Sequence, residues 1–156
     1  MTTAPAGAPP LMPHRLAVLR TDAELSFFVA GKMPGLNELV RAKGSSVKTK
    51  SGKVIVGMAY GGLKKRWQRA VADSLMLAGI ARQTPGLWRF EFQFREPDRK
   101  RNKDNIAAGA RKFIFDALQE CGVLKNDGWD EIDDWHDSFA VVAADAAGVA
   151  VRMVRV

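Results

Sequence analysis

One stretch of eight residues, WRFEFQFR at positions 88–95, constrains the fold more than any other part of the sequence. Its four aromatic side chains alternate strictly with charged and polar ones. Strict alternation over this length is typical of a β-strand with one apolar face. Because an apolar face has to be buried, the pattern predicts a sheet with helices packed against it.

Apolar patterns before this strand predict three further elements. Residues 25–31 form a short apolar run that ends at glycine, which favours a buried strand. Residues 36–42 favour a short helix after a proline–glycine turn. Between residues 60 and 80 the apolar side chains recur at helical spacing, which predicts an amphipathic helix.

The chain after this strand is expected to form a helix and two more strands. The helix should begin near Asp104 or Asn105, which are good capping residues, and end before Gly122. Residues 139–156 favour two strands around a glycine-containing turn. The predicted fold is α/β (α+β), a small mixed β-sheet with two main helices packed on one face. The helix after the strand has an apolar face at Ile106, Ala110, Phe113, Ile114, Ala117 and Leu118.

The N-terminal segment differs in composition from the rest of the chain. Residues 1–22 are rich in alanine and proline and have no uninterrupted apolar run of the kind a signal peptide needs, so we expect a flexible arm. Residues 23–156 are expected to form one domain. No apolar run approaches the roughly 20 residues of a membrane span. These features predict a cytoplasmic protein that does not insert into membranes.

The charge of the chain is strongly basic and unevenly distributed. The net charge is +7, which favours a polyanionic partner, nucleic acid first and an anionic membrane surface second. Residues 41–69 contain nine Lys or Arg and no Asp or Glu. Residues 41–53, the first part of this window, predict a mobile basic loop. The cations at 64–69 are expected on the outer face of a helix. The residues expected to hold phosphates there are Lys48, Lys50, Lys53, Lys64, Lys65, Arg66 and Arg69.

The few cysteines and histidines limit the metal chemistry. Cys121 is the only cysteine, which excludes an intrachain disulfide and a cysteine-based zinc site, and we expect it to be a small buried side chain. The histidines are His14 and His136. Carboxylates remain as the ligands of any metal, and they suit hard ions such as Mg²⁺ or Mn²⁺.

Asp104 is a candidate for either of two roles. Four cations, Arg99, Lys100, Arg101 and Lys103, come just before it and could hold a phosphate backbone against the turn. The N-terminus of the helix adds its own positive end. Asp104 could therefore hold a metal ion beside a phosphate, or simply cap the helix.

Three other acidic positions have simple structural alternatives. Asp116 is expected to pair with Lys112, four residues earlier in the same helix, or to cap a neighbouring backbone group. Asp127 follows the helix in a glycine-containing loop and is either a turn residue or a metal ligand. The segment 127–137 contains six carboxylates and favours a solvated face, in which His136 is a less favoured base or ligand.

Two blocks of this chain resemble one known family. The block RKRNKDNIAAGARKFIFDALQECGVLKNDGWDEI resembles the signature of the RusA-like Holliday junction resolvases, in the form found in phages and prophages. The block VAGKMPGLNELVRA resembles the first strand and the following turn of that family. The two blocks and the spacing between them extend over about residues 25–145.

The resemblance implies a nuclease. It implies a small mixed α/β fold, a homodimer and Mg²⁺-dependent hydrolysis of branched DNA such as four-way junctions during recombination and repair, with Mn²⁺ as a possible substitute and no small-molecule cofactor. The metal-binding aspartates of the family fall on Asn102, Asp104 and Asp127. The family's essential lysine falls on Lys112 when aligned from the D-A-L end of the helix, and on Ala108 when aligned from Asp104.

Two further residues receive a role through this comparison. Arg111, beside Lys112, is an alternative for neutralising charge on the phosphate and a candidate for binding DNA. Asn37, in the L-N-E turn, either orients the site or caps a turn.

Asn102 is where the chain departs from the family pattern. An amide offers one neutral oxygen in place of a charged carboxylate, so affinity for a divalent ion should fall. The chain is therefore either a nuclease that works with two carboxylates and an amide, or a branched-DNA-binding protein with weak or no cleavage.

The reach of the chain suggests where the site is assembled. From Asp104 to Cys121 a helix runs roughly 25 Å, whereas the five residues from Gly122 to Asp127 extend at most about 18 Å. One chain could bring the two carboxylates together only by running almost straight back. A site shared between two protomers is the alternative, and a two-fold dimer would match the symmetry of a four-way junction.

Overall fold

The computed structural model describes residues 23–156, so the arm expected at residues 1–22 lies outside the described part. Its main sheet has four strands in the order β1-β6-β4-β5. They are β1 (Glu24–Ala30), β4 (Trp88–Glu96), β5 (Ile132–Val141) and β6 (Gly148–Arg155). β5 pairs with β4 in parallel, and the other pairs are antiparallel. The sheet is therefore mixed, as predicted.

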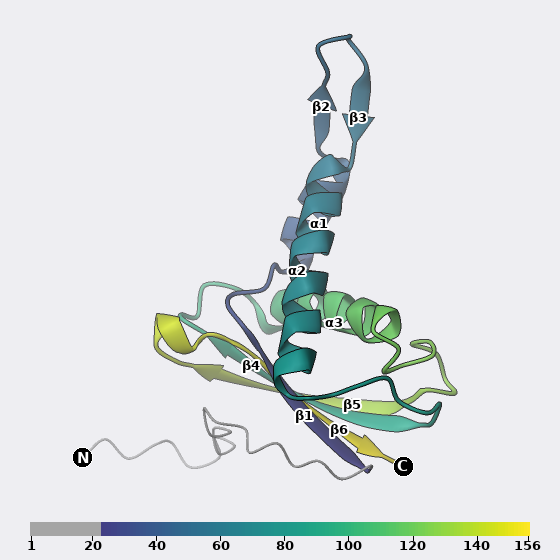
Figure 1. The fold of residues 1–156 in the computed structure, drawn as a ribbon. Coiled ribbons are helices and arrows are strands. Elements are labelled where there is room, and N and C mark those ends of the chain that lie inside the picture. Colours follow the sequence, from purple (N-terminus) through teal and green to yellow (C-terminus); the bar gives the residue numbers. More distant parts are fainter. Residues whose placement is uncertain (1–22) are drawn as a thin grey trace, which may run out of the picture.

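The helices of residues 23–156 gather on one face of this sheet (Figure 1). They are α1 (Leu36–Gly44), α2 (Met58–Leu77) and α3 (Lys103–Glu120). The three helices pack against one another, and α2 also contacts β1. The α+β fold with two long helices on one face is confirmed, and the short helix predicted at 36–42 is α1.

The aromatic side chains of β4 form the centre of the core. Phe90 and Phe92 meet the ring of Phe115 from α3 edge-on, with centroids 5.2 and 5.8 Å away. Phe94 stacks on Phe139 of β5. The alternation in the sequence thus identified the helix-facing side of the strand. It did not indicate that Gln93, Arg95 and Glu96 are also buried, at 3%, 4% and 8% exposure.

The basic segment 41–53 is not a loop, and this prediction was wrong. Ser46–Lys48 (β2) and Val54–Val56 (β3) pair as an antiparallel hairpin, closed by a hydrogen bond from the Gly52 N–H to the Thr49 carbonyl. Figure 1 shows the hairpin continuing away from the sheet beyond α1 and the start of α2. Each strand has three residues and none is buried, so no apolar alternation marked it in the sequence.

The acidic segment also takes part in the sheet. β5 begins at Ile132, seven residues before the strand expected from residue 139. Because β5 is an edge strand, its acidic first half remains exposed, as at Asp133 and Asp134, and alternates little with apolar residues. The second predicted strand is β6, and a single 3₁₀ turn, Ala144–Ala146, comes before it.

A close approach of α3 to the chain before α1 makes Gly109 sensitive to substitution. A Cβ atom there would lie 2.4 Å from the Pro34 carbonyl oxygen and 2.8 Å from the Gly35 Cα. Gly109→Ala is expected to lower the free energy of unfolding by about 1–3 kcal/mol, because backbone must shift to admit the methyl group. Gly62→Ala in α2 is the matched control, since a Cβ there meets nothing within 4 Å.

The control should instead stabilise the protein by roughly 0.5–1 kcal/mol, through helix propensity alone. Chemical denaturation of both variants measures the difference. Equal effects of the two substitutions would contradict close packing at Gly109.

Candidate functional site

An open pocket lies where β4 ends and α3 begins. Its volume is about 860 Å³. The walls come from the end of β4, the turn after it, the first residues of α3 and the end of β5. The lining residues are Glu96, Asp98, Arg99, Arg101, Asn102, Lys103, Asp104, Ile106, Phe139, Ala140 and Val141. The pocket thus contains two of the three positions implied as metal ligands, Asn102 and Asp104, together with cations.

The residue that caps α3 is Asn102, not Asp104 or Asn105. Its backbone is extended, with φ −70° and ψ 146°, and its side chain makes no capping hydrogen bond. Asp104 is exposed in the first turn, where a carboxylate interacts favourably with the positive end of the helix. The side chain of Asn105 points to α1 instead, and its Oδ1 accepts the backbone N–H of Asn37 at 2.8 Å.

Two carboxylates in the pocket were not singled out from the sequence. Asp98 accepts the backbone N–H of Lys100 at 2.9 Å, and this hydrogen bond lowers the pKa of Asp98. Glu96 is the last residue of β4 and is buried. The only signal in the sequence was their position directly after the most evident strand, where the chain leaves the sheet.

Arg101 is held inside the protein. Its Nη2 lies 2.6 Å from Glu96 Oε1, its Nη1 donates to the Met33 carbonyl at 2.8 Å, and Nη1 also lies 3.3 Å from Glu38. Its side chain is 11% exposed. Arg101 was expected to hold phosphate, but the structure uses it to fasten the turn before α3 to β4 and to the chain around α1.

The other three cations of the turn are exposed. Arg99 and Lys100 lie in the turn itself, and Lys103 is the first residue of α3. The Lys103 ammonium lies 5.3 Å from the centre of the Phe139 ring. Arg99 and Lys103 line the pocket and remain accessible to a ligand there, whereas Lys100 is exposed beside it.

Asp127 lies far from the pocket. It is exposed and follows the carboxyl end of α3, whereas Asp104 is near the amino end. At about 1.5 Å per residue, the 18 residues of α3 span about 27 Å. The sheet leads to the same conclusion, since Asp127 precedes Ile132 at the Trp88 end of β4, and the pocket is at the Glu96 end.

A single chain therefore does not assemble the implied metal ligands. Within residues 23–156 no three His, Cys, Asp or Glu side chains form a group that could hold a metal ion. The chemistry of the donors suits Mg²⁺, but their arrangement in one chain does not fit it.

The candidates in the middle of α3 are paired with neighbours. Lys112 Nζ lies 3.6 Å from Asp116 Oδ2, which confirms the predicted pair. Arg111 forms an ion pair with Asp137 of β5, and its guanidinium lies 5.2 Å from the centre of the Trp135 ring. Both residues are outside the lining of the pocket.

The remaining candidates also lie outside the pocket. His136 is exposed on β5 next to Glu91 in register. Cys121 is half-buried at the end of α3, and burial raises the pKa of its thiol. The exposed position of His136 agrees with the solvated face predicted for its segment, whereas Cys121, expected to be buried, is only partly so.

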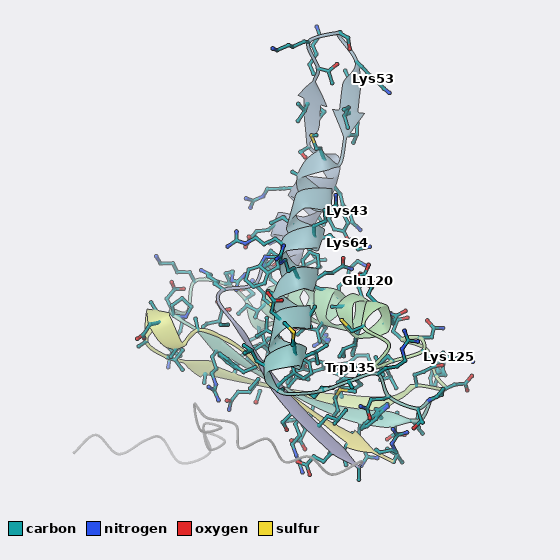
Figure 2. All side chains as sticks on the ribbon, viewed as in Figure 1. Lys43, Lys53, Lys64, Glu120, Lys125 and Trp135 are labelled. Carbon is teal, nitrogen blue, oxygen red and sulfur yellow. The ribbon has the colours of Figure 1, made fainter. Side chains whose placement is uncertain are left out.

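Residues 41–69 form a basic stalk, made of the end of α1, the β2–β3 hairpin and the first part of α2. Lys48, Lys50 and Lys53 are exposed on the hairpin, and Lys65, Arg66 and Arg69 are exposed on α2. Lys64 is half-buried. Figure 2 shows Lys53 at the tip and Lys43 and Lys64 along the stalk, in line with one another.

In the part of the chain from residue 23 onward, no helix has the length and apolar character to cross a membrane. No family model matches this chain, and no curated protein matches its sequence.

Proposed function

We propose that this protein is a structure-selective endodeoxyribonuclease that resolves Holliday junctions and other branched DNA by Mg²⁺-dependent hydrolysis, in recombination and repair. The observation that carries the proposal is the pocket at the start of α3. It combines Asn102 and Asp104 with the exposed cations Arg99 and Lys103, and Lys100 is exposed in the same turn. The motif order in residues 25–145 supports the same activity.

The charge of the chain supports DNA as the substrate. The basic stalk has nine cations and no acid, and the pocket lies near its base, where Arg101 contacts the carbonyl of Met33 just before α1. A duplex held by the stalk would pass close to the pocket. Cations arranged in this way hold a phosphate backbone without selecting a sequence.

The proposal requires a homodimer. Since Asp104 and Asp127 lie at opposite ends of α3, the pocket of one protomer has to receive Asp127 from the partner chain. A two-fold dimer would then hold two equivalent sites, which suits two symmetric nicks in a four-way junction.

The second candidate is a branched-DNA-binding protein with weak or no cleavage. Two observations favour it. Asn102 supplies an amide where the resemblance implies a carboxylate, and the described residues hold no ready group of metal ligands. The stalk and the exposed cations of the pocket would serve this function equally well.

Nicking of a labelled synthetic four-way junction in Mg²⁺ or Mn²⁺ distinguishes the two candidates. Wild-type protein is compared with Asn102→Asp and Asp104→Asn. The nuclease proposal expects paired symmetric nicks, and their rate should fall at least about 100-fold in Asp104→Asn. Binding without nicks, with cutting gained only in Asn102→Asp, would establish the binding protein. Absence of binding to any branched DNA would contradict both candidates.

A further inference from the structure

The β2–β3 hairpin at the end of the basic stalk contributes no buried side chain to the core. All six residues of its strands are at least partly exposed, including Val54 at 58% and Val56 at 66%. A two-stranded hairpin of this size is only marginally stable in water unless something covers it. The face that carries Val54 and Val56 together with Lys48 is therefore expected to be covered by a partner.

We propose that this hairpin is a ribbon that enters the major groove of a DNA duplex, just under one helical turn from the pocket. The inference rests on the proposed DNA partner but not on cleavage. A two-stranded β-ribbon fits the width of the major groove. Lys48, Lys50 and Lys53 would meet the phosphates on either side, and Val54 and Val56, which share one face of the ribbon, would face apolar atoms in the groove, such as thymine methyl groups.

The reach of the stalk sets the distance. α1 begins beside α3, where the Asn37 N–H binds Asn105, and its nine residues rise about 13 Å. Residues 46–50 add about 16 Å at about 3.3 Å per residue. The hairpin tip thus lies roughly 30 Å from the pocket, which corresponds to about nine base pairs at 3.4 Å each.

This distance places the tip and the pocket on nearly the same side of one duplex. Figure 1 shows α1 and the hairpin extending in the same direction, so the two lengths add. A duplex lying along the stalk would meet the pocket at one point and the hairpin at the next approach of the same groove.

Other partners suit the hairpin less well. A stalk from a second copy would carry the same nine positive charges and would repel the first. An anionic membrane surface would attract the cations, but it would not require the fixed distance between hairpin and pocket. Duplex DNA accounts for the charge, the narrow ribbon and the distance together.

Two pairs of substitutions that remove equal charge test the proposal. Lys50→Gln with Lys53→Gln alters the hairpin tip. Arg82→Gln with Lys125→Gln is the control, because both residues are exposed and line one hollow on the body of the protein. Figure 2 shows Lys53 and Lys125 at distant parts of the molecule.

Binding to a linear duplex and to a four-way junction is measured in EDTA, so that cleavage does not enter the result. The hairpin pair should reduce the slope of log K against log salt by about 1.8 and weaken binding roughly 60-fold near 0.1 M salt. The control pair should change both the slope and the affinity by less than the hairpin pair does. Equal losses of DNA affinity in the two double variants, or no loss of affinity in the hairpin pair, would overturn the inference.

A chemical probe tests the distance directly. An iron chelate that cleaves nearby DNA is attached at Ser51→Cys or at Lys103→Cys, each in a Cys121→Ser background. The two sets of cuts should be centred about nine base pairs apart. Overlapping cuts, or no cuts from position 51, would overturn the proposed geometry. The inference would also fail if the Lys50→Gln, Lys53→Gln variant bound anionic vesicles more weakly than wild type but bound DNA equally well.

These results separate the two proposals. If the protein binds no DNA, the proposed function fails as well. If it binds DNA and the hairpin substitutions have no effect, only the inference about the hairpin fails.

Discussion

Arg101→Met is expected to destabilise the protein by about 3–5 kcal/mol, because it leaves a buried carboxylate without its partner. Glu96 and Arg101 have side chains that are 10% and 11% exposed, with 2.6 Å between Oε1 and Nη2. The substitution also removes the donor to the Met33 carbonyl. The change in the free energy of unfolding is measured by chemical denaturation.

Two variants show whether the effect comes from the ion pair. Arg99→Met removes the same charge from an exposed position in the same turn and should change stability by less than about 0.5 kcal/mol. Arg101→Met combined with Glu96→Leu removes both buried charges and should recover much of the loss. If Arg101→Met weakens DNA binding and leaves stability unchanged, Arg101 binds phosphate as the sequence had suggested.

Mixing two inactive variants is expected to restore junction nicking. In a mixed dimer, one protomer carries Asp104→Asn and the other Asp127→Asn. If each site is shared between protomers, one of the two sites is intact, because it combines Asp127 of the first protomer with Asp104 of the second. After random exchange half of the dimers are mixed, so nicking should return to about a quarter of the wild-type rate. Each variant alone should be inactive.

The opposite result is equally informative. If all ligands came from one protomer, every protomer in the mixture would be defective and no activity would return. A mixture of Asp104→Asn with wild-type protein, measured in parallel, shows whether the protomers exchange. Restoration well below a quarter, despite demonstrated exchange, would contradict the shared site.

The sequence predicted best those elements that have one buried face. β4 was evident because its aromatic residues alternate, and α3 because its apolar residues recur at helical spacing. The six apolar positions expected on α3 are all buried: Ile106, Ala110, Phe113, Ile114, Ala117 and Leu118. Burial imposes a period on the sequence, and that period can be read without a structure.

Elements without a buried face could not be found in this way. The β2–β3 hairpin is held by backbone hydrogen bonds and a tight turn, which leave little trace in a lysine-rich segment. The first half of β5 is exposed at the edge of the sheet, so its acidic residues predict a solvated face but not a strand.

The candidate site was predictable only as far as local sequence determines it. Asn102 and Asp104 are close together because they flank the start of one helix. The partners of Arg101 at Glu38 and Met33 are more than 60 residues away in sequence, and nothing local identifies them. Glu96 and Asp98 are close to Asp104 in sequence, but only the structure shows that all three line one pocket.

The separation between the core and the hairpin has an evolutionary consequence. No side chain of β2 or β3 is buried, whereas the body of the protein is closed by aromatic packing around Phe115. Insertions and deletions are tolerated best in exposed segments that make few contacts with the core. Lineages could therefore lengthen, shorten or recharge the hairpin while the packed body stays the same. The distance that the hairpin reaches and the chemistry of the pocket would then diverge at independent rates.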